Sequence, residues 1–187
     1  MDFRSHSWSL KSLSPLLMHN PAAMALSTRE QKNHEKCAKV AAYWDVDGDL
    51  CFPTVAFRKA LFQATRGKKI GRVSLHTFLL PVVLTGEAEW MKLLDSRGKP
   101  LRTYEVYVVT VVVIKARVPR ARPRIESWQG ILNLLIDHDC LPDVDDDAAR
   151  LADITANLND AGQKIGVGDW RIEKGGQFGR FTATFVK

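Results

Sequence analysis

The sequence predicts an α+β fold, in which one sheet carries two helices on one face, within a single domain that spans residues 1–187. Three observations indicate this class. Segments with the two-residue alternation of strands lie near both ends of the chain. Two segments with helical spacing, residues 54–66 and 147–161, lie between strand-like segments. Hydrophobic residues make up 45% of the chain, which is enough for one substantial core.

The first predicted strand covers residues 6–13, where Trp8 and other apolar residues alternate with polar ones. It is followed by a change of direction at His19-Asn20-Pro21, because an asparagine before proline disfavours helix. The chain then contains few large apolar residues, so we expect a partly helical insertion at about residues 21–50. Within this insertion, Asp47-Gly48 predicts the turn of a short hairpin.

Three alternating acids in this hairpin resemble the start of a calcium-binding loop: Asp45, Asp47 and Asp49. The glycine of that motif comes too early, however, and Ala56 stands at the twelfth position, where a bidentate glutamate is required. We therefore predict no metal site here. No other motif in the chain indicates a cofactor, so we expect none.

The first long helix begins after Pro53-Thr54 and ends at Gly67, with Phe57 and Leu61 on its inward face. An apolar run over residues 73–84 follows. Residues 106–114 contain seven valines or isoleucines in nine positions, which predicts a strand in the centre of a sheet.

Residues 126–136 predict a further strand. The acidic turn at residues 143–147 then opens the second helix as a cap, since acids at a helix start complement its dipole. We expect Gly162 to end this helix and residues 178–186 to form the last strand.

Two short segments together contain nine cations and no acid, whereas the net charge of the whole chain is only +6. Basicity that is local in this way is typical of a surface that follows phosphates. Two unrelated basic loops that face water are the alternative. The first segment contains Arg66, Lys68, Lys69 and Arg72, and the second contains Lys115, Arg117, Arg120, Arg122 and Arg124.

The cations of the second segment recur mostly at every second residue, which places them in rows on one side of an extended chain. Pro119 and Pro123 exclude a helix and a central strand, so we expect an edge strand or a protruding hairpin. Such an edge also discourages aggregation, which is a structural alternative. Four of its five cations are arginines, however, and arginine binds phosphate bidentately and stacks on bases.

Residues 166–181 are rich in glycine, with five of the twelve glycines of the chain. Glycines such as Gly166 and Gly168 allow backbone amides to face an anion, while aromatic and arginine side chains can lie against bases. A tight hairpin that closes a sheet and binds nothing is the alternative. The remaining candidate contacts in this segment are Trp170, Arg171, Lys174, Phe178 and Arg180.

Other features exclude several classes of protein. The three cysteines, Cys37, Cys51 and Cys140, form no metal-binding or redox motif, and we expect them to be reduced. No apolar run is long enough to cross a membrane, and the N-terminus does not resemble a secretory signal, so we expect a cytoplasmic location. Motifs of serine hydrolases, P-loop proteins and zinc proteases do not occur.

The predicted order β-α-β-β-α-β is the ferredoxin-like plan, which is also that of the RNA-recognition motif. With the long insertion after the first strand, the basic hairpin at residues 115–124 and the glycine-rich segment from Ala161 to Phe181, the chain resembles the RAMP superfamily of CRISPR-associated proteins. Within that superfamily of antiviral defence it is most similar to a compact Cas7-type backbone subunit, encoded by a CRISPR system or by a phage.

This resemblance implies a non-catalytic protein that binds RNA or single-stranded DNA and associates with itself or with other CRISPR-type subunits. Two alternatives remain. A Cas6-like endoribonuclease would cleave RNA without metal, and His19 would be its best-placed general base, ahead of His34 and His76. A phage anti-CRISPR protein would instead mimic a Cas7 subunit and cap its assembly.

Overall fold

The structure is a computed structural model that describes residues 2–27, 29–70, 72–86, 88–113, 116–139 and 147–186. Within these ranges the side chains of residues 70, 111–113, 116–117 and 147–150 are not described. The fold is α+β, as the sequence predicts, with antiparallel sheets and four α-helices in the described part. None of these helices has the length and apolar character needed to cross a membrane.

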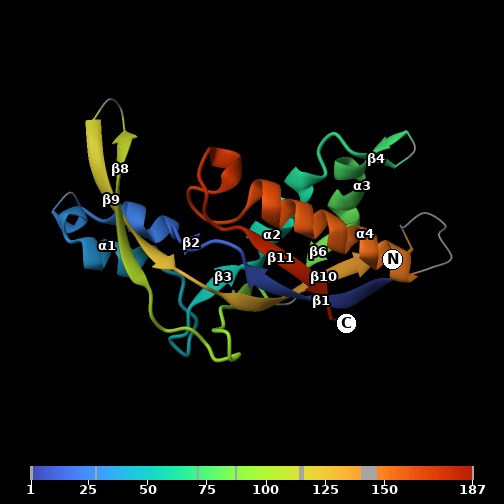
Figure 1. The fold of residues 1–187 in the computed structure, drawn as a ribbon, viewed down its shortest axis with the longest axis horizontal. Helices are drawn as coiled ribbons and strands as arrows, with labels where there is room; N and C mark the ends of the chain where they lie inside the picture. The colour runs from blue at the N-terminus through green and yellow to red at the C-terminus, as the bar shows by residue number, and fades with distance from the viewer. Residues whose placement is uncertain are drawn as a thin grey trace.

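The main sheet has four strands: β1 (Phe3–Ser12), β6 (Val83–Thr85), β10 (Gln129–Asp137) and β11 (Phe181–Phe185). They are all antiparallel and lie in the order β11-β1-β10-β6 (Figure 1). The long strand β1 therefore pairs with β10 on one side and with the C-terminal strand β11 on the other. The predicted strands at residues 6–13 and 126–136 are confirmed as β1 and β10.

Helices α2 (Thr54–Ala64) and α4 (Asp147–Asp160) cover one face of this sheet (Figure 1). Both were predicted. A further helix, α3 (Leu75–Val82), was not: it occupies most of the apolar run at residues 73–84 and precedes β6 directly. Its sequence contains Pro81 and no clear alternation of polar residues, so the run alone does not distinguish helix from strand.

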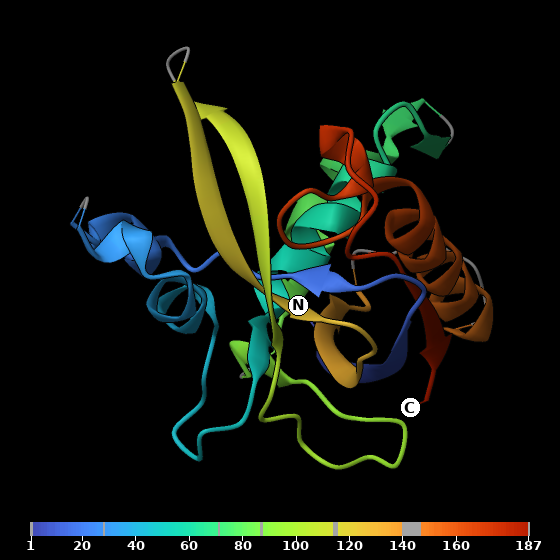
Figure 2. The ribbon, with the colours of Figure 1, turned by 60° about the vertical axis from the view of Figure 1, so that its left-hand side comes forward.

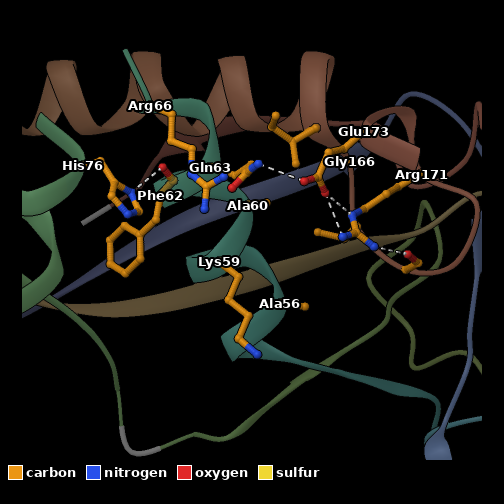
Figure 3. Close-up of a pocket in the computed structure, with 13 residues that line it drawn as sticks. Ala56, Lys59, Ala60, Phe62, Gln63, Arg66, His76, Gly166, Arg171 and Glu173 are labelled. Carbon is orange, nitrogen blue, oxygen red and sulfur yellow. Dashed lines mark hydrogen bonds and ion pairs between the residues drawn. The ribbon is translucent and has the colours of Figure 1, made fainter. Parts of the chain in front are cut away.

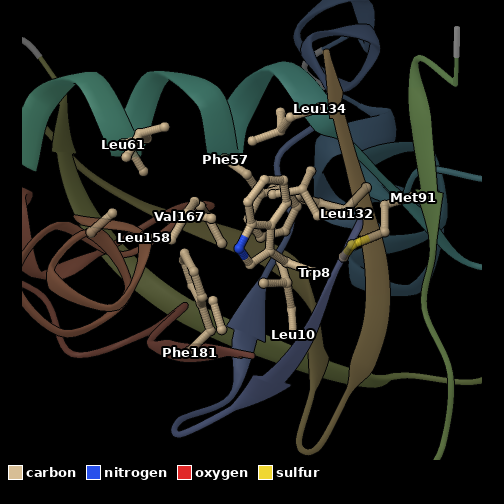
Figure 4. Close-up of a cluster of buried hydrophobic side chains, with 14 of the residues drawn as sticks. Trp8, Leu10, Phe57, Leu61, Met91, Leu132, Leu134, Leu158, Val167 and Phe181 are labelled. Atoms are coloured by element: carbon tan, nitrogen blue, oxygen red, sulfur yellow. The ribbon is translucent and has the colours of Figure 1, made fainter. Parts of the chain in front are cut away.

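The core lies between the main sheet and helices α2 and α4 (Figure 4). Trp8, Phe57 and Phe181 are fully buried there, one from a central strand, one from α2 and one from β11. The Trp8 indole Nε1 donates a hydrogen bond of 2.8 Å to Thr155 Oγ1 on α4, so this buried side chain has its polar atom satisfied. The equally buried Trp128 has no hydrogen-bond partner for its Nε1 among the described residues. The other face of the sheet carries Ser9 of β1 and also Ile131 of β10, which is 44% exposed.

A long hairpin of β8 (Glu105–Val113) and β9 (Ala116–Ile125) projects from the molecule (Figure 2). At its base β9 also pairs with β2 (Leu16–Leu17), which makes a second, three-stranded sheet in the order β2-β9-β8. The predicted protruding basic hairpin is therefore confirmed, but the exclusion of a central strand is wrong at its base, where β9 lies between β2 and β8. Pro123 is tolerated there because its carbonyl accepts a hydrogen bond from the Met18 amide, which requires no N–H from the proline.

The prediction that residues 106–114 occupy the centre of a sheet is wrong. Strand β8 is an edge strand that pairs with β9 alone, and Val108 is 43% exposed. Valine favours extended backbone, and this preference stabilises a two-stranded ribbon without burial on both faces. The ribbon packs on helix α1 (His34–Ala41) at Ala121, and Ala38 and Ala121 are buried there.

The segment between β2 and β3 forms the predicted insertion, which is partly helical. It contains η1 (Pro21–Ala25), η2 (Glu30–Lys32) and α1, followed by the turn at Asp47-Gly48, where Gly48 donates its amide to the Asp45 carbonyl. The remaining short strands form two pairs, β3 (Cys51–Pro53) with β7 (Trp90–Lys92) and β4 (Lys69–Ile70) with β5 (Val73–Ser74). Cys37 and Cys51 are buried free thiols, whereas Cys140 lies outside the described residues.

Gly162 does not end the second long helix, contrary to the prediction. The helix continues from α4 through a π-helical turn, η3 (Ala161–Ile165). It ends at Gly166, where φ is +74°. Gly162 has a different role, because a Cβ there would collide with the carbonyl of Phe181 in β11. It permits the helix to approach the strand. Of the predicted acidic cap, residues 143–146 lie outside the described residues.

Candidate nucleic-acid interface

The glycine-rich segment folds into a closely packed loop against the connection between β1 and β2. The amide of Asp169 donates to the Leu17 carbonyl at 2.9 Å, and the amide of Gly179 donates to the Pro15 carbonyl at 2.7 Å. A Cβ on Gly168 would collide with the Leu17 carbonyl, and one on Gly179 would collide with the Val167 carbonyl. Several of its glycines thus serve the internal packing of the loop.

Trp170 has a left-handed backbone, with φ of +49°, and is the only described residue other than glycine with a positive φ. This conformation costs roughly 1–2 kcal/mol for a residue with a side chain. The Trp170 carbonyl accepts a hydrogen bond from the Phe178 amide at 3.2 Å, and Gly176 packs directly against the same carbonyl. The loop therefore holds a strained tryptophan at the surface, where it is 36% exposed.

The loop is tied to the basic hairpin by one ion pair and one aromatic contact. Arg122 Nε on β9 donates to Asp169 Oδ2 at 2.8 Å. Tyr107 on β8 packs edge to face against Phe178, with ring centroids 5.7 Å apart. Phe178 is only 6% exposed, so its ring fills this contact and is not offered to a ligand.

Arg120, Arg122 and Arg124 project from one side of β9, as the alternation predicts, because Ala121 between them is buried against α1. Arg124 forms ion pairs with Glu105 and Glu126, at 2.9 Å and 2.6 Å. Arg120 is half-buried and forms no ion pair with the residues that the structure describes. Lys115 lies outside the described residues, and so does the side chain of Arg117.

The first basic segment lies on the opposite side of the loop, at the end of α2 and in the hairpin of β4 and β5 (Figure 1). Arg66, Lys69 and Arg72 are exposed and make no ion pair within the described part of the chain. Lys68 differs, because its Nζ donates to Asp160 Oδ2 at 2.6 Å and to Asn157 Oδ1 at 2.7 Å. Lys68 thus anchors the turn between α2 and β4 to the end of α4.

A hollow of about 400 Å³ separates the loop from α2 and contains Arg66 together with Gly166, Gly168 and Arg171 (Figure 3). Arg171 donates from Nε and Nη2 to Glu173 Oε2, at 3.0 Å and 2.8 Å. A second hollow, of about 320 Å³, lies on the hairpin side of the loop, where Tyr107, Trp170, Lys174 and other loop residues line it. Arg180 lines a third, which it shares with Tyr107.

His19 follows β2 and lies close enough to the arginines of β9 for their charges to act on it. Its Nδ1 is buried and has no hydrogen-bond partner among the described residues. Burial lowers its pKa from the usual 6.5, and the positive charges of Arg122 and Arg120 lower it further, against an opposing effect of Asp169. Both effects favour the neutral form of the imidazole.

The three acids of the calcium-like hairpin surround an ammonium group. Lys92 Nζ lies 2.9 Å from Asp45 Oδ2, 3.0 Å from Asp47 Oδ2 and 3.1 Å from Asp49 Oδ2. Arg102 Nε also donates to Asp49 Oδ1, at 2.7 Å. Lys92 and Arg102 thus offset two of the three negative charges, and these contacts lower the pKa of Asp45 and of Asp49.

Neither protein-family models nor curated proteins give a match to this sequence. The spatial arrangement of the predicted contact residues is therefore known from the structure alone. It brings the loop into contact with Arg122 of β9 on one side and places Arg66 in the lining of the hollow on the other. It also adds Tyr107, Lys59 and Gln63, which the sequence did not single out. The helical spacing of Lys59 and Gln63 with Arg66 was the signal available for two of them.

Proposed function

We propose that this protein binds single-stranded nucleic acid, RNA or DNA, without cleaving it. The observation that carries the proposal is the position of the glycine-rich loop between two basic segments that are far apart in the sequence (Figure 2). Arg122 contacts the loop at Asp169, and Arg66 shares a hollow with Gly166 on its other side. A strand that crosses the loop would meet cations along its whole course.

The cations on this path fall into two groups. Lys68, Arg122, Arg124 and Arg171 already pair with carboxylates of the chain. Unpaired cations are the ones that can replace the counterions of phosphates, and their release makes binding depend on salt. We assign the phosphate contacts to five of the predicted cations that make no ion pair with described residues: Arg66, Lys69, Arg72, Arg120 and Lys174.

Trp170 is the residue that we assign to base stacking. Its indole is partly exposed beside Tyr107 and Lys174, in the second hollow. Stacking of a base on an aromatic ring is worth about 1–3 kcal/mol and tolerates any sequence. The strained backbone at this position supports a functional role, since an ordinary loop would relax it.

We also propose that the main sheet is ferredoxin-like and that the chain belongs with the RAMP superfamily, as a Cas7-type subunit. The strand order supports this: the four strands run fourth, first, third and second in chain order across the sheet. Helix α2 precedes the second strand and α4 precedes the fourth, on the same face. A glycine-rich loop between the last helix and the last strand is the remaining point of agreement.

The test is fluorescence anisotropy with a labelled single-stranded oligonucleotide, at about 50 mM and 200 mM NaCl. We expect binding that weakens steeply with salt and that is reduced by Arg120→Glu and by Trp170→Ala. Arg97→Glu is the matched control, because Arg97 is exposed in the turn between β7 and β8. Absence of binding at the lower salt, or equal binding at both, would contradict the proposal.

RNA cleavage is the second candidate, and the position of His19 beside the cationic side chains of Arg122 and Arg120 is the observation in its favour. A neutral imidazole can accept a proton from a 2′-hydroxyl, and metal-free cleavage also requires an acid for the leaving oxygen. Incubation of labelled RNA with the wild type and with His19→Ala, both in EDTA, distinguishes the two functions. Fragments that only the wild type produces would establish an enzyme, and intact RNA in both reactions would leave the binding function.

A further inference from the structure

The hollow beside α2 exists because two small residues face the loop. Ala56, Lys59, Ala60 and Gln63 follow one another at helical spacing along α2, and Arg66 continues the row just past the helix end (Figure 3). At this spacing their side chains lie on one face. The two alanines leave space that larger side chains would fill, whereas the lysine, glutamine and arginine border it.

The charge of the hollow is positive. Among the described residues that line it, Glu173 is the one carboxylate, and both its oxygens are used: Oε2 accepts from Arg171, and Oε1 accepts from Gln63 Nε2 at 2.9 Å. Its charge is therefore balanced within the wall. Lys59 and Arg66 are exposed and make no ion pair with described residues, so their two charges remain available to an anion.

At one end of the hollow, the His76 imidazole can form a hydrogen bond with a ligand. His76 Nδ1 lies 2.9 Å from the Phe62 carbonyl, and because a carbonyl only accepts, Nδ1 carries the proton in this contact. In the neutral ring Nε2 is then left as an acceptor. In Figure 3 this ring lies on the same side as Arg66, and Arg171 lies on the other.

The remaining wall is apolar. Ala56 and Ala60 of α2 line it together with Ile165 of η3 and Val167 of the loop. A site for a bare inorganic anion would not need such a wall, whereas the flat face of a base would cover it. The size agrees, since about 400 Å³ lies in the range of small-molecule sites.

From these features we infer that the hollow is a pocket for one nucleotide, with its phosphate at Arg66 and Lys59 and its base against the apolar wall. The inference rests on the proposed function and makes it more specific, because it assigns one unit of the bound strand to this pocket. A free mononucleotide presents the same chemistry and would bind in the same way.

The experiment is calorimetric titration with adenosine 5′-monophosphate, adenosine and inorganic phosphate. We expect the monophosphate to bind the wild type and to bind Arg66→Ala about tenfold more weakly, as loss of a charge-assisted hydrogen bond predicts. Ala56→Leu fills the pocket without a change of charge and should weaken binding to a similar extent. Arg97→Ala is the matched control and should bind as the wild type does, and circular dichroism verifies the fold of each variant.

Equal binding of the monophosphate by the wild type, Arg66→Ala and Ala56→Leu would overturn the pocket, even if oligonucleotides bind. Binding of inorganic phosphate as tightly as the monophosphate would overturn the assignment of the base to the apolar wall. If the monophosphate binds in an Arg66-dependent manner while oligonucleotides fail to bind, the pocket stands as a mononucleotide site and the strand-binding function is wrong.

Discussion

Arg122 and Asp169 join the projecting hairpin to the glycine-rich loop through a hydrogen-bonded ion pair of 2.8 Å. The arginine side chain is only 11% exposed, so this contact is largely shielded from water. The pair fixes the position of the candidate contacts on β9 relative to Trp170, which follows Asp169 directly. Its removal should therefore affect both stability and nucleic-acid binding.

The first prediction concerns this pair. Asp169→Asn should lower the free energy of unfolding by about 1–3 kcal/mol, because it leaves the Arg122 guanidinium poorly compensated. Urea denaturation measures the change. In a double-mutant cycle, adding Arg122→Gln to Asp169→Asn should cost less than Arg122→Gln costs alone. Strictly additive losses would show that the two side chains do not act as a pair.

The second prediction separates two glycines of the loop. Gly179 has φ of +69° and packs directly against the Val167 carbonyl, whereas Gly175 has φ of +75° and no atom within 4 Å of the position that a Cβ would take. Gly175→Ala should cost about 1 kcal/mol, from the backbone alone. Gly179→Ala should cost about 3 kcal/mol or more, since the backbone must also move. Thermal unfolding compares them, and equal costs would show that the loop adjusts freely.

The third prediction concerns Lys92, whose ammonium lies among Asp45, Asp47 and Asp49. Lys92→Met should destabilise the protein at pH 7, because three carboxylates would then repel one another with only Arg102 nearby. In the wild type the pKa values of Asp45 and Asp49 lie below the usual 3.8. A lowered pKa stabilises the fold above 3.8, and this contribution disappears as the pH falls through the folded-state pKa.

The difference in stability between wild type and Lys92→Met should therefore be largest near pH 7 and should shrink as the carboxylates become protonated. Thermal unfolding at a series of pH values down to about pH 3 follows this change. A difference that stays constant over the series would mean that Lys92 stabilises the turn by packing and not by charge.

The sequence predicted the helices and strands in which the spacing of apolar residues shows which face is buried. Strand β1 and helix α2 show the alternation or helical spacing that one buried face imposes, and both formed as predicted. The prediction for residues 106–114 was wrong because a high valine content indicates that the backbone prefers an extended conformation. It does not indicate which strands lie beside that segment. Position in a sheet depends on which strands lie beside it, and that is decided by distant segments.

For the candidate site, the sequence located cations but not their partners. Lys68 and Arg66 stand two residues apart in the same basic segment, yet one is tied to Asp160 and the other borders the hollow. Asp160 follows Lys68 by 92 residues, so no local pattern reveals the ion pair. The same holds for Gly162, whose partner is the backbone of Phe181 in a separate strand.

Lys68 and Lys69 provide the last prediction, because adjacent lysines should serve different purposes. Lys68 bridges α2 and α4 through Asp160, which is also held by Lys164, and these contacts lower the pKa of Asp160. Lys68→Ala should reduce the free energy of unfolding by about 0.5–1 kcal/mol, as partly exposed ion pairs do. Lys69→Ala should leave stability unchanged, since Lys69 is exposed and makes no ion pair with described residues.

In nucleic-acid binding the order of the two variants should be reversed, so that Lys69→Ala has the larger effect and Lys68→Ala the smaller one. Loss of a phosphate contact reduces the slope of log affinity against log salt by about one, which is the result expected for Lys69→Ala. Lys68→Ala should retain the wild-type slope, because its ammonium is already paired with Asp160. Anisotropy titrations over a salt series, combined with urea denaturation, measure both quantities. A reduced slope for Lys68→Ala would mean that phosphate competes successfully with Asp160, and the assignment of contacts to unpaired cations would then be wrong.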